Sequence, residues 1–142
     1  MNKSIIFSLL ISSMFSLNSF ACSCADWEGA STMLAESDMV ALVVPTEESK
    51  VYQSSAIGKM QKTGMKIVKR FKGKYKSFMY LLSERNTGAN CGVNFNSYDG
   101  LWLVMGYKVP GEKYYVTGGC SVGFVTPEDT ELTKLIKELG KL

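Results

Sequence analysis

Residues 39–45 read Met-Val-Ala-Leu-Val-Val-Pro, and residues 101–107 read Leu-Trp-Leu-Val-Met-Gly-Tyr. Both runs are short, apolar and rich in β-branched or aromatic residues, and the first stops at a proline, so each predicts a β-strand. Residues 78–82 and 114–117 have the same character and predict two more strands. These runs make the chain mainly β.

A further strand is predicted at residues 64–71, where the alternation of apolar and polar residues is imperfect. Met65 and Ile67 are in phase, while Val68 and Phe71 slip out of it. An extra residue in one strand of a pair produces this slip, so the stretch predicts a strand with a bulge. Residues 47–62 are polar and are expected to form a loop.

The end of the chain carries the clearest helix pattern. Thr126 is the expected cap, Pro127 suits the first helical position, Asp129 follows three residues after the cap, and Gly140 is a natural stop. One apolar stripe is made by Leu132, Leu135, Ile136 and Leu139. Residues 26–35 predict a short N-terminal helix. Five strands with these helices favour a closed or partly open barrel of the OB type, with a two-sheet sandwich as the alternative.

The first 21 residues have the features of a signal peptide. Met1-Asn2-Lys3 is a short positive start typical of bacterial signals, and residues 5–17 are an uncharged run too short for a stable membrane anchor. Ser19-Phe20-Ala21 has small residues at its first and last positions, as an Ala-x-Ala cleavage site does, which places the cut before Cys22. We therefore expect an exported, secreted or periplasmic, single domain at residues 22–142, with no transmembrane span after cleavage.

All four cysteines, Cys22, Cys24, Cys91 and Cys120, lie after the expected cut. An even number in a small exported domain predicts two disulfides. Cys22 and Cys24 are too close to bridge each other without strain, so each is expected to join one of the distant cysteines, in either of two pairings. Zinc ligation is disfavoured because the paired C-x-x-C spacing is missing. A redox role for C-x-C is disfavoured because no βαβ pattern surrounds it.

The composition argues against catalysis. The chain contains no histidine, which excludes histidine triads, histidine-bound metals and the usual proton shuttle at neutral pH. Bridged cysteines offer no thiolate nucleophile. The neighbouring carboxylates, Glu47-Glu48 and Glu128-Asp129, do not predict two groups facing each other across a cleft. We expect no enzyme activity and no cofactor.

A basic stretch without any acid runs from residue 59 to residue 76, although the net charge of the whole chain is only +3. Its cations are Lys59, Lys62, Lys66, Lys69, Arg70, Lys72, Lys74 and Lys76. Either it is an ordinary solvated strand face, or it binds a polyanion such as a surface glycan. Nucleic acid is not an expected ligand of an exported protein.

Several motifs, taken in order, resemble one known family. A signal peptide cut directly before Cys-Ser-Cys is followed by Ala-Glu-Ser-Asp-Met-Val-Ala-Leu-Val-Val at residues 35–44. Residues 66–73 read Lys-Ile-Val-Lys-Arg-Phe-Lys-Gly, and Cys91-Gly92, residues 101–106 and Gly118-Gly119-Cys120 come after them. Together these motifs resemble the tissue inhibitors of metalloproteinases (TIMPs) and related netrin-like domains, over residues 22–120.

The resemblance implies an OB-type barrel with Cys22 paired to Cys91 and Cys24 to Cys120. It also implies a partner, a zinc metalloprotease, whose catalytic zinc is chelated by the α-amino and carbonyl groups of the first cysteine, here Cys22. Zinc keeps an open coordination position in such enzymes, and an α-amino group is partly neutral near pH 7. An inhibitory edge is implied at Cys22, Ser23, Cys24 and Ala25, with Ala89, Asn90 and Gly92 beside it.

The chain also departs from the family pattern. It lacks the third disulfide of the inhibitor domain and the separate C-terminal subdomain, and Ala25-Asp26-Trp27 contains no proline. A non-inhibitory netrin-like binding module, of the cell surface or periplasm, is therefore the alternative function. Lipidation of Cys22, as in bacterial lipoproteins, would block its amine, but Ser19-Phe20-Ala21 matches such a site poorly.

Overall fold

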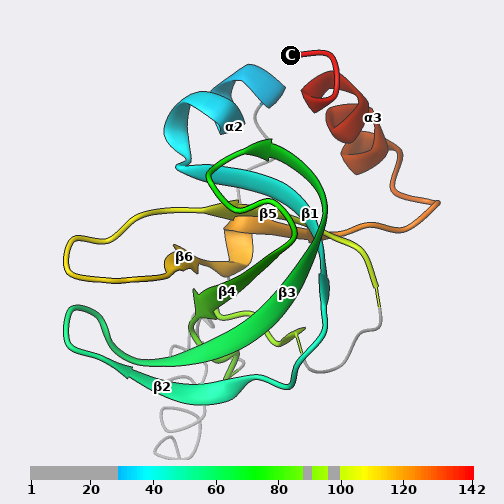
Figure 1. Ribbon diagram of the computed structural model, residues 1–142. Coiled ribbons are helices and arrows are strands. Elements are labelled where there is room, and N and C mark those ends of the chain that lie inside the picture. The colour runs from blue at the N-terminus through cyan, green and yellow to red at the C-terminus, as the bar shows by residue number, and fades with distance from the viewer. Residues whose placement is uncertain (1–28, 88–90, 96–99) are drawn as a thin grey trace, which may run out of the picture.

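The computed structural model describes residues 29–87, 91–95 and 100–142. Within these ranges seven strands form one curled sheet, flanked by two α-helices (Figure 1). The strands are β1 (Met39–Pro45), β2 (Lys50–Ser54), β3 (Gly58–Lys72), β4 (Phe78–Ser83), β5 (Trp102–Gly106), β6 (Tyr115–Thr117) and β7 (Val122–Phe124). The helices are α2 (Ala30–Glu36) and α3 (Thr130–Leu139), with a 3₁₀ turn, η2 (Gly119–Ser121), before β7. The mainly β prediction is confirmed.

The sheet runs in the order β6-β4-β3-β1-β5-β7, and β2 pairs with β3 outside this path. Every pairing is antiparallel except that of β4 with β6. A bridge between Tyr107, just after β5, and Val116 in β6 joins the two sides of the sheet. The sheet therefore curls toward a barrel, and it is a single sheet rather than the two of a sandwich.

Strand β1 is apolar throughout because both of its faces are covered. Met39, Ala41 and Val43 point into the curled sheet, where they pack with residues of the other strands. Val40 and Leu42 point outward and pack under the two helices. The resulting outer cluster joins α2 and α3 to β1 and β5. Figure 1 shows the two helices together at the top of the molecule.

Strand β3 is long and bulged, as its sequence predicts. Its pairing with β1 shifts register between Leu42 and Val43 and again between Val40 and Ala41. These shifts leave Val68 and Phe71 as the extra residues of β3, the same two that break the alternation in the sequence. Bulges increase local twist, so these two add to the curl of the sheet along this strand.

The prediction of five strands is wrong, because β2 and β7 were not expected. β2 and the first part of β3 form a hairpin within residues 47–62, where a loop was predicted. Most residues of β2 are exposed, so they carry no alternation that a sequence pattern can detect. At the turn, the Ser54 hydroxyl accepts the N–H groups of Ala56 and Ile57 at 3.1 Å each, and Gly58 adopts a φ of 81°.

Helix α3 begins later than predicted. Asp129, rather than Thr126, is the N-cap, and its carboxylate accepts the N–H of Leu132 at 2.9 Å. An ionised cap is also favoured by the partial positive charge at a helix N-terminus. The helix ends at Gly140 as expected. Three of the four stripe residues, Leu132, Leu135 and Leu139, are buried in the outer cluster.

Candidate functional site

Most of the predicted inhibitory edge lies outside the described residues. This applies to Cys22, Ser23, Cys24, Ala25, Ala89 and Asn90. Gly92 is described and is buried against the backbone that follows β4. A Cβ added at Gly92 would lie 2.4–2.5 Å from backbone atoms of Arg85 and Asn86. Only glycine fits there, so residue 92 holds its neighbour Cys91 close to the end of β4.

The two described cysteines lie next to each other at this end of the sheet. The N–H of Gly119 donates to the carbonyl of Cys91 at 2.6 Å, which sets Cys120 one residue away from that contact. Both Cys91 and Cys120 are disulfide-bonded, and no described cysteine is a free thiol. Because Cys22 and Cys24 are not described, the pairing stays a prediction.

A pocket of about 390 Å³ opens beside Cys91. It is lined by Ile57, Met60, Glu84, Cys91, Tyr107, Val109, Val116, Thr117 and Gly118. The lining comes from the turn of the β2–β3 hairpin, from the ends of β4 and β6, and from the segment after β5. Among the described residues that line the pocket, Glu84 supplies the one acidic group and most of the others are apolar, so the pocket suits an apolar group.

A cluster of three tyrosines, missed in the sequence, surrounds Lys62 on the outer side of the sheet. The Lys62 ammonium lies 5.6 Å from the ring centre of Tyr52, 4.8 Å from that of Tyr80 and 5.4 Å from that of Tyr114. The tyrosines come from β2, β4 and the residue before β6, and their rings meet edge to face. Distances below about 6 Å are those of cation–π attraction. We call this group the tyrosine cage.

Glu112 anchors one wall of the tyrosine cage. Its carboxylate accepts the Tyr52 hydroxyl at 3.2 Å and the N–H groups of Lys113 and Tyr114 at 2.8 and 3.4 Å. These bonds tie the segment 107–114 to the β2–β3 hairpin, which reaches the same side of the molecule in Figure 1.

The hydrogen bonds around Glu112 also shift two pKa values. Hydrogen bonding from the side chain of Ser54, and then from the two backbone N–H groups and Tyr52, lowers the pKa of Glu112. Desolvation, followed by the nearby Glu112 charge, raises the pKa of Tyr52. Glu112 is therefore held ionised and Tyr52 neutral near pH 7.

The basic stretch 59–76 does not form one continuous cationic surface. Lys72 donates to the Leu34 carbonyl near the end of α2, and Arg70 donates to the Gly73 carbonyl at 3.2 Å. These two cations serve local structure, because a lysine near a helix C-terminus satisfies a carbonyl that has no partner within the helix. Lys62, by contrast, lies in the tyrosine cage. The curl of β3 thus separates the cations into groups with different surroundings.

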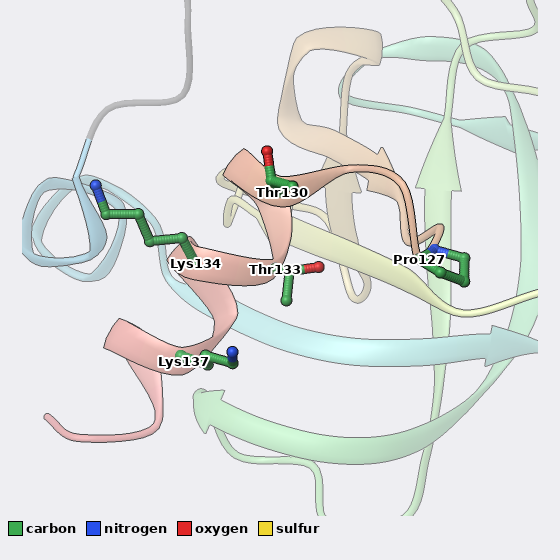
Figure 2. Close-up of a pocket in the computed structure, with 5 residues that line it drawn as sticks. All are labelled: Pro127, Thr130, Thr133, Lys134 and Lys137. Carbon is green, nitrogen blue, oxygen red and sulfur yellow. The ribbon is translucent and has the colours of Figure 1, made fainter.

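A second pocket, of about 240 Å³, lies along α3 and is lined by Pro127, Thr130, Thr133, Lys134 and Lys137. Figure 2 shows that the lysine ammonium groups and the threonine hydroxyls point in different directions. Their polar atoms do not converge on one point, as binding a single anion would require. This pocket is a hollow between surface side chains.

Within the described ranges, no group of three or more histidine, cysteine or acidic side chains is placed to hold a metal ion. No helix in the described part of the chain is long and apolar enough to cross a membrane. Compared with known proteins, the chain matches no protein-family model and no curated protein.

Proposed function

We propose that the protein is a secreted metalloprotease inhibitor of the TIMP-like type, which chelates the catalytic zinc of its target through the α-amino and carbonyl groups of Cys22. One observation supports this most: Cys91 and Cys120 are disulfide-bonded, and the N–H of Gly119, the residue before Cys120, donates to the Cys91 carbonyl at 2.6 Å, which keeps the two cysteine-bearing segments together. Two cysteines separated by one residue span at most about 7 Å. Cys22 and Cys24 can therefore each reach one of this neighbouring pair.

In this proposal the pairs are Cys22–Cys91 and Cys24–Cys120. Two bridges within three residues would fix the N-terminus on the end of the sheet and lower the ordering cost of binding. Ser23 would then enter the pocket of the protease beside the zinc, with Ala25 continuing the edge and Ala89, Asn90 and Gly92 alongside. In this proposal the protein acts by binding and not by catalysis.

The strand order supports an OB-type barrel as part of the same proposal. Without β2 and β7, five strands follow one another as β1-β3-β4-β6-β5, and the Tyr107–Val116 bridge links the last two. β5 returns to β1, which closes the circuit. A five-stranded, partly open Greek-key barrel is the OB architecture.

The first experiment is the intact mass of the exported protein, before and after reduction. A mass of residues 22–142 with two disulfides means a free Cys22 amine. A mass raised by acyl chains means lipidation, which contradicts zinc chelation.

The second experiment measures inhibition of a panel of zinc metalloproteases by the protein and by a variant with one alanine inserted before Cys22. We expect inhibition by the protein and none by the variant, with both equally stable to urea, because the insertion moves the amine away from the zinc. Undiminished inhibition by the variant would refute chelation. If the protein has a free Cys22 amine and still inhibits no protease of the panel, the inhibitor proposal is wrong. The non-inhibitory netrin-like binding module is then the function that remains.

A further inference from the structure

The tyrosine cage presents a lysine whose charge is not neutralised by any acid of the described chain. Lys62 is half-buried, and three rings surround its ammonium at 4.8–5.6 Å. Among the described residues neither a hydrogen bond nor an ion pair reaches this ammonium. Ring faces attract a cation but leave its N–H donors unpaired, so the ammonium is held in place with its hydrogen-bonding capacity unused.

The surface around the tyrosine cage adds cations and one open ring. Lys66 is the cross-strand partner of Phe78, and Lys50 is that of Lys62. Phe78 is 40% exposed and meets Tyr80 edge to face, 5.2 Å between ring centres. Lys113 adds a further cation at 5.5 Å from the ring centre of Tyr114.

Among the described residues, Glu112 and Glu47 are two acids whose contacts place them at this surface. Glu112 accepts the Tyr52 hydroxyl and two backbone N–H groups. The Glu47 side chain packs on Gly64, where its carbons lie 2.8–2.9 Å from the position of an added Cβ. Lys50, Lys62, Lys66 and Lys113 outnumber these two acids among the described residues placed here, so the surface complements a negatively charged ligand.

We propose that this face of β3 and β4, centred on the tyrosine cage, binds an anionic oligosaccharide. A carboxylate or sulfate of the sugar receives the N–H donors of Lys62, and a sugar ring lies on Phe78. Lys66 and Lys113 receive neighbouring acidic groups. This is also the face by which barrels of the OB type hold extended polymers.

Single-stranded nucleic acid fits this surface less well. Its binding relies on successive bases stacking on open aromatic faces. Here the Lys62 ammonium already lies over the rings of all three tyrosines, and among the described rings of this face Phe78 is the exposed one. Recognition must therefore come mainly from charge. The site shares no residue with the proposed inhibitory edge, and its test does not depend on protease inhibition.

The test measures binding of the exported protein, with its disulfides intact, by calorimetry at about 0.15 M salt. The probes are a heparin octasaccharide, an octamer of polyuronate, a neutral maltooligosaccharide and an eight-residue thymidine oligonucleotide. We expect binding of at least one acidic saccharide and none of the neutral one. Failure of both acidic saccharides to bind, or equally tight binding of the oligonucleotide, would overturn the proposal.

Substitutions then locate the site. Lys62→Met is expected to weaken binding about 10- to 100-fold, as loss of a charge-assisted hydrogen bond does. Lys74→Met is the matched control, because Lys74 belongs to the same basic stretch and also lies over a tyrosine, 5.2 Å from the ring centre of Tyr75. Equal losses in the two variants would mean binding to net charge alone and would refute the site.

Phe78→Ala keeps the test decisive if Lys62→Met folds poorly. Phe78 is the exposed ring of the site, so its removal should leave the fold intact. We expect affinity for the acidic saccharide to fall roughly fivefold to tenfold, by loss of one ring contact. An unchanged affinity in a folded Phe78→Ala variant would contradict the placement of the ligand on this face.

Discussion

Gly119 and Gly118 are neighbours whose replacement by alanine should have opposite consequences. A Cβ at Gly119 would lie 2.4 Å from the Cys91 carbonyl oxygen, whereas real Cβ contacts are longer than 3.0 Å. The carbonyl would have to retreat by at least about 0.6 Å. At Gly118 nothing lies within 4 Å of an added Cβ, and the backbone is extended with a φ of -118°.

The cost of Gly119→Ala follows from two effects. Forcing a carbon into a filled space costs about 1–3 kcal/mol. Lengthening the bond from the Gly119 N–H to the Cys91 carbonyl, 2.6 Å in the native protein, costs about 1 kcal/mol more. We therefore expect Gly119→Ala to lower the free energy of unfolding by about 2–4 kcal/mol. Gly118→Ala should leave it unchanged or raise it by about 0.5 kcal/mol, because alanine restricts the unfolded chain.

Urea unfolding of the two variants, each with intact disulfides, measures this difference. The two variants can be compared if the free energy of unfolding falls with urea concentration at the same slope in both, since this slope reports the surface exposed on unfolding. If Gly119→Ala is as stable as Gly118→Ala, the close approach of the two cysteine-bearing segments is not a feature of the native protein. The main support for the proposed inhibitory edge would then be lost.

Three further outcomes test other parts of the structure. Asp129→Ala should destabilise the protein by about 1 kcal/mol in urea unfolding while Thr126→Ala has no effect, because Asp129 is the cap of α3; the reverse order would contradict that assignment. The lowered pKa of Glu112 means that its contribution to stability is full well above its ordinary pKa of 4.5 and is lost as the pH falls through the lower folded value. The free energy of unfolding should therefore fall less between about pH 7 and pH 3 in the Glu112→Gln variant than in the native protein. An identical fall in both would argue against a stabilising role of the Glu112 carboxylate. Ser83→Ala should be neutral or slightly stabilising, because Ser83 is only 1% exposed and its hydroxyl has no hydrogen-bond partner among the described residues. Its control, Thr117→Val, loses a 2.8 Å bond to a carbonyl and should cost about 1 kcal/mol in the same thermal or urea unfolding.

The elements that could be predicted from the sequence are those that bury apolar residues in a regular pattern. β1, β4, β5 and α3 carry such patterns, and all four lie within a residue or two of the expected positions, apart from the start of α3. The bulges of β3 were also predictable, because Val68 and Phe71 break an alternation that Met65 and Ile67 establish. A register slip leaves its trace in the order of the residues themselves.

β2 could not be predicted because most of its residues are exposed and its two non-polar side chains, Val51 and Tyr52, are adjacent, so no alternation distinguishes a strand from a loop. The cap of α3 was assigned to Thr126 because a threonine before a proline is a common helix start. Whether Thr126 or Asp129 caps the first turn of α3 depends on the path of the chain into the outer cluster, and this path brings Asp129 to the Leu132 N–H.

The sequence by itself determined the β-rich class, the terminal helix and the four cysteines of the expected mature chain, because periodicity and composition are local properties. Only the tertiary structure decided that Cys91 and Cys120 lie side by side, that the basic stretch is divided, and that three tyrosines from three different segments surround Lys62. These features join residues up to 62 positions apart in the chain, between Tyr52 and Tyr114. Their physical origin is the curl of the sheet, which is set by the pairing of strands and by the bulges of β3 rather than by any single stretch of sequence.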